Sequence, residues 1–258
     1  MSHPIPVIVN GAFGRMGRIA CLALENQSEF CVVAQLGRED NLQDTMIKTQ
    51  ARIVVDVTRA DCVFANALRI IENNAHPVIG TSGLNEAQLN HLRELCEKKQ
   101  LGGIIAPNFS MGAVLMMHFS ALAARFFPDV EIIEAHHPQK QDAPSGTALK
   151  TADLIHSVRA QAPQIGTQSH TLAGARGASY HHIPIHSVRL PGILARQQVI
   201  FGAPGETLTV AHDSIDRHCF IPGIRLACQQ VTTLTRLHYG LEHLMGLKDQ
   251  SNACTMPS

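Results

Sequence analysis

The first half of the chain alternates short apolar runs with longer stretches in which hydrophobic side chains return every three or four positions. Short continuous apolar runs predict strands buried on both faces, and the longer periodic stretches predict helices. The predicted strands cover residues 6–10, 31–36, 53–57, 77–79 and 103–106, and a predicted helix follows each of them except the second. The repeated strand-then-helix order predicts an α/β fold built on an open parallel sheet.

The second half has a different pattern. A β-branched run at residues 130–135 precedes a predicted helix with Leu149 and Ile155 on its apolar face, and residues 160–178 are polar and predict a loop. Further strands are expected at 183–190, 198–201 and 207–212, the last two joined by a hairpin turn at 203–205. This pattern predicts an α+β domain with a mixed open sheet. A last helix is expected from Pro222 through Leu234, with a frayed tail after Leu247.

A glycine-rich turn joins the first strand to the first helix. Gly11, Gly14 and Gly17 stand in GAFGRMG, a spacing that suits a Rossmann-like dinucleotide site in which the helix N-terminus holds a pyrophosphate. The form is GxxGxxG rather than GxGxxG, so a glycine turn without a ligand is the alternative. The small or hydroxyl residues Thr58 and Gly80 to Ser82 end two other strands, where ligands bind in such sheets.

The end of the second strand bears on the choice of nucleotide. An acidic residue there bonds the ribose hydroxyls of NAD, and a basic residue accommodates the 2′-phosphate of NADP. This chain has Gly37, Arg38 and Glu39 in succession. Arg38 is the stronger candidate contact, Glu39 a possible substitute acid, and NADPH is favoured over NADH.

Composition narrows the class of protein further. The chain has 258 residues with 21 basic and 21 acidic side chains in no like-charge block, which argues against a nucleic-acid or membrane partner. No signal segment or membrane-spanning run is recognisable, so we expect a soluble cytoplasmic protein. The seven cysteines do not have the spacing of a zinc site. Three histidines lie close together in the sequence, but no carboxylate or cysteine completes a metal site with them, so no metal is expected (His181, His182 and His186).

Residues 131–147, EIIEAHHPQKQDAPSGT, carry the densest candidate chemistry. A histidine such as His136 or His137 can trade a proton near neutral pH, and Lys140 supplies a compact cation. The backbone N–H groups of Ser145 to Thr147, at a predicted helix start, suit a carboxylate. The stretch predicts a site for an anionic substrate that must be protonated. The alternatives are structural packing of these side chains, a nucleotide-sensing module without catalysis, and an amino-acid dehydrogenase acting on aspartate or a similar acid.

This same stretch resembles the E-x-H-H-x-x-K-x-D-A-P-S-G-T signature of the 4-hydroxy-tetrahydrodipicolinate (dihydrodipicolinate) reductase family. The resemblance extends to GAFGRMG, DVTR, GTSG, APNFS, HSVRLPG and FGAPGETL. It implies an NADH- or NADPH-dependent enzyme of the diaminopimelate and lysine pathway that acts on a small dicarboxylate and forms a homotetramer through the sheet of its second domain. The implied domains are a dinucleotide-binding domain at 1–107, completed by 218–258, and a substrate-binding and oligomerisation domain at 108–217.

The resemblance also implies roles for particular residues. His136 would be the proton donor and Lys140 the second donor and charge stabiliser, while the substrate would be bound by His137, Ser145, Gly146 and Thr147. The nucleotide would be lined by Gly11, Ala12, Phe13, Gly14, Arg15, Met16, Arg38, Gly80, Thr81, Ser82, Ala106, Pro107, Asn108 and Phe109. Two departures stand out: Gly37 replaces the acid that many relatives carry, and the short segment between Arg38 and Arg52 is expected to lack the helix and strand of longer relatives.

Overall fold

The computed structural model describes residues 3–25, 27–159 and 171–247. The chain divides into two compact units. Unit 1 comprises Met1–Met111 and Arg217–Gly246, and unit 2 comprises Gly112–Asp216 and Leu247–Ser258. Unit 2 is therefore inserted into unit 1, whose second segment returns after the insertion.

Unit 1 is built on a six-stranded parallel sheet with strand order β11-β5-β4-β3-β1-β2. The two central strands β3 and β4 are buried along their whole length, as the continuous apolar runs predict. The strands are β1 (Ile5–Asn10), β2 (Phe30–Leu36), β3 (Ile53–Asp56), β4 (His76–Ile79), β5 (Gly103–Ile105) and β11 (Leu237–Tyr239). The parallel α/β architecture expected from the sequence is confirmed.

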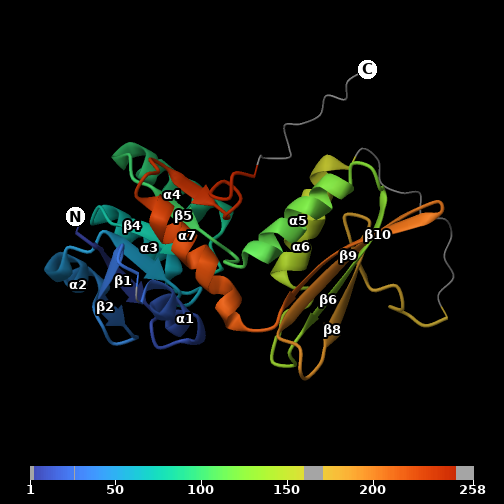
Figure 1. The fold of residues 1–258 in the computed structure, drawn as a ribbon, viewed down its shortest axis with the longest axis horizontal. Coiled ribbons are helices and arrows are strands. Elements are labelled where there is room, and N and C mark those ends of the chain that lie inside the picture. The colour runs from blue at the N-terminus through green and yellow to red at the C-terminus, as the bar shows by residue number, and fades with distance from the viewer. Residues whose placement is uncertain (1–2, 26, 160–170, 248–258) are drawn as a thin grey trace, which may run out of the picture. The chain divides into compact units, whose positions relative to one another are not determined.

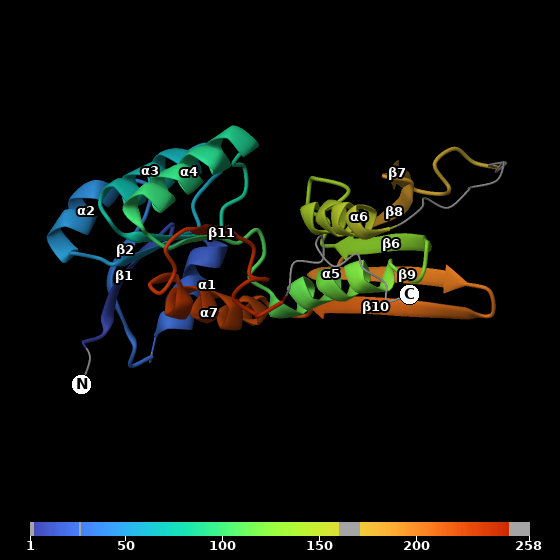
Figure 2. The same ribbon diagram turned by 90° about the horizontal axis from the view of Figure 1, so that it is seen from above.

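Helices cover both faces of this sheet (Figures 1 and 2). On one face lie α1 (Arg15–Leu24) and α7 (Ile221–Val231), and on the other α2 (Leu42–Thr49), α3 (Val63–Glu72) and α4 (Glu86–Lys99). The second group packs its buried residues, such as Met46, Ile70 and Leu92, against sheet residues that include Val54 and Ile79. The result is a three-layer nucleotide-binding type of fold whose strand ends carry the candidate residues.

Helix α2 corrects one expectation from the sequence. The segment between Arg38 and Arg52 was expected to lack a helix, yet it forms the eight-residue helix α2 and no strand. Asn41 caps it, because its side chain accepts a hydrogen bond from the backbone N–H of Asp44 (3.2 Å), and Leu42 and Met46 are buried one turn apart. A good N-cap and one buried i, i+4 pair thus suffice for a short helix in this packed context.

Unit 2 contains a five-stranded mixed sheet with order β10-β9-β6-β8-β7, in which only β6 and β8 run parallel. Helices α5 (Met111–Ala123) and α6 (Gly146–Val158) pack on one face through small residues such as Ala123, Ala148 and Ala152. The strands are β6 (Asp129–His136), β7 (Ala178–Tyr180), β8 (Ile183–Arg189), β9 (Ala195–Ala203) and β10 (Glu206–Ser214). The mixed second sheet is confirmed.

The short strands and the last helix differ from the sequence-based expectation, and two expected segments lie outside the described residues or mostly so. The three-residue strands β7 and β11 were not expected, because they are too short to show a period. Helix α7 follows the 3₁₀ helix η1 (Arg217–Phe220) and ends at Val231 rather than at Leu234. The expected tail after Leu247 and most of the expected 160–178 loop lie outside the described residues. None of the described helices is long and apolar enough to cross a membrane.

Candidate functional site

The turn between β1 and α1 is shaped by two glycines that could not be replaced without moving the backbone. Gly11 has a φ of +84°, and a Cβ there would lie 2.9 Å from the carbonyl oxygen of Val57. A Cβ on Gly17 would lie 2.0 Å from the carbonyl oxygen of Gly11. The turn is anchored as well, since the N–H groups of Gly11 and Ala12 donate to the carbonyl of Leu36 (2.9 and 3.0 Å). Glycine is therefore required by close packing of turn, helix and strand.

This turn presents a helix N-terminus suited to an anion. The N-cap of α1 is Gly14, which offers no side-chain cap, and no acidic residue stands in the first turn. The first i→i−4 bond of the helix is the one from Arg18 to Gly14 (3.1 Å), so the preceding N–H groups are free of intrahelical partners. Together with the helix dipole, these N–H groups fit the pyrophosphate of a dinucleotide.

Buried Asp56 ties the neighbouring strand ends together, a role that the sequence reasoning missed. Its carboxylate accepts hydrogen bonds from the side-chain amides of Asn10 (2.8 Å) and Asn66 (2.9 Å) and from the hydroxyls of Thr58 (2.6 Å) and Thr81 (3.3 Å). These partners come from β1, α3 and the turns after β3 and β4. An acid at the end of a wholly apolar strand was the available signal, since a buried carboxylate requires such partners.

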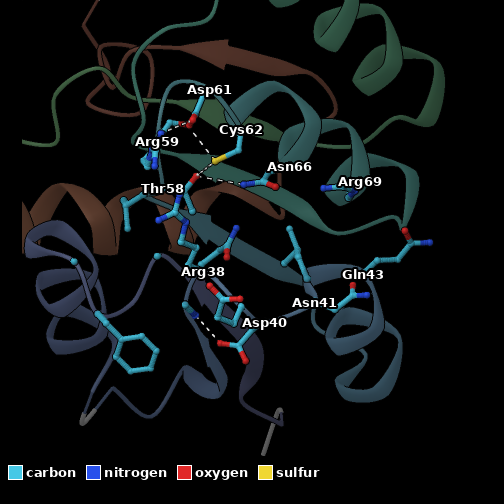
Figure 3. A pocket seen from close by; sticks show the side chains of 18 residues that line it. Arg38, Asp40, Asn41, Gln43, Thr58, Arg59, Asp61, Cys62, Asn66 and Arg69 are labelled. Atoms are coloured by element: carbon cyan, nitrogen blue, oxygen red, sulfur yellow. Dashed lines mark hydrogen bonds and ion pairs between the residues drawn. The ribbon is translucent and has the colours of Figure 1, made fainter.

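A pocket of about 830 Å³ opens beside this network within unit 1 (Figure 3). Of the expected nucleotide residues, Gly11, Phe13, Gly14 and Arg38 line it. Arg38 extends from the loop after β2, near Asp40, whose carboxylate accepts the backbone N–H of Gly37 (2.7 Å). The remainder of the lining comes mainly from the loops after β2 and β3 and from α3 (Asn10, Gly37, Glu39, Asp40, Asn41, Leu42, Gln43, Val57, Thr58, Arg59, Asp61, Cys62, Asn66 and Arg69).

The other expected nucleotide residues lie outside this pocket lining, in or beside the turns that follow β1, β4 and β5. Phe109 is buried, and a Cβ on Gly80 would lie 2.6 Å from its ring, so Phe109 can reach a ligand only through its backbone. Asn108 accepts the N–H of Ser110 (2.8 Å) through its side chain. Outside the lining stand Ala12, Arg15, Met16, Gly80, Thr81, Ser82, Ala106, Pro107, Asn108 and Phe109.

In unit 2, His136 is held by a buried carboxylate that the sequence reasoning did not single out. Nδ1 of His136 lies 2.6 Å from Oε2 of Glu134, which is fully buried two residues earlier in β6. Arg189 in β8 donates from Nη1 to Oε2 (3.0 Å) and from Nη2 to Oε1 (2.9 Å) of the same carboxylate. Burial alone would raise the pKa of Glu134, but the hydrogen bonds from His136, Arg189 and Ser187 and the charge of Arg189 lower it to about 2.

The turn after β6 carries His137, the second histidine, and Lys140, the expected cation. Nζ of Lys140 donates to both carboxylate oxygens of Asp142 (2.8 Å each), and this hydrogen bond lowers the pKa of Asp142. His137 is half-buried, and its Nδ1 is buried without a hydrogen-bond partner among the described residues. Lys140 is thus a paired cation with one face of its ammonium still available, and His137 keeps a polar ring atom for another group.

The start of α6 is held in place by an N-cap and by a series of buried side-chain hydrogen bonds. Ser145 is the N-cap; its hydroxyl accepts the N–H of Ala148 (3.2 Å), and its own N–H donates to Glu134 (3.3 Å). Gln197 donates to the hydroxyl of Thr151 (2.8 Å), which donates to the carbonyl of Thr147 (2.7 Å). Ser145 therefore serves as a cap, whereas the first N–H groups of the helix, at Gly146 and Thr147, suit a carboxylate.

The three histidines considered as metal ligands bind separate partners or none. His181 lies 3.1 Å from Asp153, and His186 lies 2.8 Å from Glu131. Within the ranges that the structure describes, no group of three or more His, Cys, Asp or Glu side chains could hold a metal ion.

The parallel sheet carries a glycine turn that suits a pyrophosphate, and the same chain holds a histidine on a buried carboxylate. Both features are typical of oxidoreductases that depend on a nicotinamide nucleotide. Comparison with family models shows to which family of this class the chain belongs. The model described as "Dihydrodipicolinate reductase, N-terminus" matches residues 5–109, and "Dihydrodipicolinate reductase, C-terminus" matches 112–245. The chain belongs to the dihydrodipicolinate reductase family, which confirms the resemblance inferred from the sequence.

Individual relatives agree with this assignment. The chain is 60% identical over 239 residues, 93% of its length and 98% of the relative's, to the 4-hydroxy-tetrahydrodipicolinate reductase of Legionella pneumophila (strain Corby). It is 50% identical to that of Coxiella burnetii (strain Dugway 5J108-111), covering 93% of this chain and 99% of the relative. A solved structure titled "Dipicolinate bound Dihydrodipicolinate reductase from Paenisporosarcina sp. TG-14" is 42% identical, with a TM-score of 0.86, over 93% of this chain and 99% of that one.

Proposed function

We propose that this chain reduces 4-hydroxy-tetrahydrodipicolinate to tetrahydrodipicolinate in diaminopimelate and lysine biosynthesis, with NADH or NADPH as hydride donor and His136 as proton donor. One observation carries the proposal: the ring of His136 is fixed through Nδ1 by a buried, ionised carboxylate. Relatives with up to 60% identity across nearly their whole length bear the name of this activity.

The reaction adds one hydride and one proton to the substrate and releases the 4-hydroxyl group as water. Loss of water leaves a conjugated C=C–C=N system, and hydride addition to it leaves an electron-rich carbon that must take up a proton. A histidine suits this step because it can be protonated near neutral pH. With Nδ1 committed to Glu134, the proton would leave from Nε2 of His136.

The substrate's carboxylates would be bound by the turn after β6 and the start of α6. The N–H groups of Gly146 and Thr147 would hold one carboxylate with the help of the helix dipole. Lys140 would stabilise the charge that develops on the substrate. His137 would be a further substrate ligand. The structure titled as dipicolinate-bound, which is that of a relative, supports a small dicarboxylate as the substrate class.

The nucleotide would be held by unit 1, where the residues fit such a group. The glycine turn leaves no room for a side chain between strand and helix, and the pocket of about 830 Å³ adjoins it. When bound, a reduced nicotinamide supplies the hydride. Arg38 would contact the 2′-phosphate of NADPH, and Asp40 or Glu39 the ribose hydroxyls of NADH, so the pocket offers partners to both cofactors.

Two other functions considered from the sequence are less well supported. A nucleotide sensor needs neither the fixed histidine nor the lysine. An amino-acid dehydrogenase would share the fold but not the HHxxK spacing. A solved structure titled "Structure of Amine Dehydrogenase from Mycobacterium smegmatis" is only 12% identical to this chain (TM-score 0.62, 90% of this chain and 93% of that chain), and this likeness shows the fold alone.

The assembly would be a cytoplasmic homotetramer formed through the sheet of unit 2. Helices α5 and α6 pack on one face of this sheet, whereas Ile133 and Ile200 point to the other and are only half-buried. A second copy covering that face would bury them. Light scattering at several protein concentrations should give the mass of a tetramer, and a monomeric mass would refute this assembly.

The experiment that tests the activity is substrate-dependent oxidation of the nicotinamide cofactor. The substrate is unstable, so it should be generated in the cuvette by the preceding synthase. We expect oxidation of NADH or NADPH only when the synthase product is present. Oxidation that is absent with both cofactors, or that proceeds equally without the synthase, would rule out the proposed reaction.

A further inference from the structure

The carboxylate of Glu134 is buried in unit 2 and accepts several hydrogen bonds. On β6, Val130, Ile132, Glu134 and His136 share one face, because alternate residues of a strand point the same way. The first two belong to the core, and Glu134 has no exposed surface. An acid in this place has to be satisfied by its neighbours.

Donors from four residues surround this carboxylate. His136 and Arg189 share Oε2, while Arg189 and the N–H of Ser145 share Oε1, at distances between 2.6 and 3.3 Å. The side chain of Ser187 donates a further hydrogen bond. Because Glu134 is ionised, it can only accept hydrogen bonds. Nδ1 of His136 must therefore carry a hydrogen, which leaves Nε2 as the ring atom that exchanges a proton.

Arg189 connects this carboxylate to the turn that carries Lys140. Besides binding Glu134, its Nη2 donates to the carbonyl oxygen of Asp142 (2.6 Å). Its positive charge also offsets the carboxylate, so the negative charge that His136 faces is smaller than that of a lone carboxylate.

We propose that Glu134 and Arg189 are positioning residues for the general acid: Glu134 fixes the tautomer and orientation of His136, and Arg189 limits how strongly the carboxylate retains the imidazolium proton. This inference rests on the proposed function, because it needs a reaction in which His136 gives up a proton. Neither residue needs to touch the substrate. If the pair served only to join β6 to β8, changing it would alter stability but not the pH dependence of turnover.

The test is the pH dependence of kcat for the full chain and its variants. For Glu134→Gln, we expect the alkaline limb of the profile to move to lower pH by about one unit or more, because the imidazolium loses its stabilising charge. For Arg189→Gln, we expect the limb to move to higher pH, because the carboxylate then acts uncompensated. Glu134→Asp keeps the charge and should leave the limb near its wild-type position while lowering kcat.

A matched control is available on the same strand. Glu131 accepts hydrogen bonds from His186 and Arg176 on the other face of β6, so Glu131→Gln removes a similar carboxylate that does not contact His136. This variant should keep the alkaline limb in place. Far-ultraviolet circular dichroism and a cooperative urea unfolding transition show that a variant is folded.

The outcomes separate this inference from the proposed function. If the wild type shows no substrate-dependent turnover, the proposed function fails. The wild type can instead show turnover while the alkaline limb stays in place in Glu134→Gln and Arg189→Gln, or moves in the same direction in both. The positioning role is then overturned, and the proposed activity stands. If Glu134→Gln does not fold, the other two variants decide. An alkaline limb that does not move in Arg189→Gln, or one that moves in Glu134→Asp, also overturns the positioning role.

Discussion

The candidate catalytic side chains of unit 2 are each paired with a carboxylate. Lys140 donates to both carboxylate oxygens of Asp142, and Nδ1 of His136 binds one carboxylate oxygen of Glu134. In each pair the carboxylate influences the charge or the orientation of the candidate catalytic residue. The chemistry of a residue such as His136 therefore depends on a neighbour two positions away, on the same face of the strand.

Removing Lys140 should weaken both binding and chemistry. For Lys140→Ala we expect KM for the dicarboxylate to rise about 10-fold or more and kcat to fall, since a charge-assisted hydrogen bond is lost. Steady-state kinetics with freshly generated substrate measures both constants. Lys150→Ala removes an exposed lysine from α6 and serves as the control. An unchanged KM in Lys140→Ala would exclude contact with a substrate carboxylate.

Glu134 should make folding stability depend on pH in the acid range. Its pKa is about 2 in the folded chain against an ordinary value of 4.5, so its contribution is present above about pH 4.5 and is lost as the pH falls toward 2. That contribution is on the order of 3 kcal/mol, since one pKa unit corresponds to about 1.4 kcal/mol. Urea unfolding at several pH values should give a flatter stability curve for Glu134→Gln, and parallel curves would contradict this.

At the scale of elements, the turn between β1 and α1 is a tightly constrained segment of unit 1. The contact of 2.0 Å that a Cβ on Gly17 would make is with backbone, which cannot move aside as a flexible side chain could. Gly17→Ala should lower the free energy of unfolding by about 3 kcal/mol. In the control Gly202→Ala, the added Cβ meets nothing within 4 Å. Chemical denaturation of both variants measures this, and equal stability would refute it.

We expect the loops after β2 and β3 to determine the cofactor preference. Arg38, Glu39 and Asp40 all line the pocket of unit 1, so a cation and two acids are available there to the adenosine end of a nucleotide. For Arg38→Ala we expect the ratio of kcat/KM for NADPH to that for NADH to fall about 10-fold or more. Arg93→Ala, on α4 and outside the pocket lining, should leave the ratio unchanged. A ratio unaffected by Arg38→Ala would show that this arginine does not read the 2′-phosphate.

The buried central strands were predictable from the sequence although they are short, and the edge strands β7 and β11 were not. The strands β3 and β4 are visible in the sequence as continuous apolar runs, and Ser145 is recognisable as a helix N-cap. Helix α2 was missed because one buried pair of side chains is too weak a periodic signal. Local sequence also could not reveal Arg189, since it lies 55 positions from Glu134 and meets it only through the parallel pairing of β6 with β8.

At the scale of the whole molecule, the two units separate the two halves of the proposed reaction. Unit 1 carries the glycine turn and the adjoining pocket, and unit 2 carries His136, Lys140 and the start of α6. Because unit 2 is an insertion, α7 and β11 follow it in the chain and complete unit 1.

This separation predicts that the proton donor can be removed without loss of nucleotide binding. The most direct measurement compares the wild type with His136→Gln, using substrate generated by the preceding synthase and recording cofactor oxidation and cofactor affinity in parallel. His156→Gln, which changes an exposed histidine of α6, is the matched control. We predict that His136→Gln lowers kcat by about 10² or more while the Kd of the reduced cofactor is unchanged. Wild-type turnover in His136→Gln would contradict its role as the proton donor.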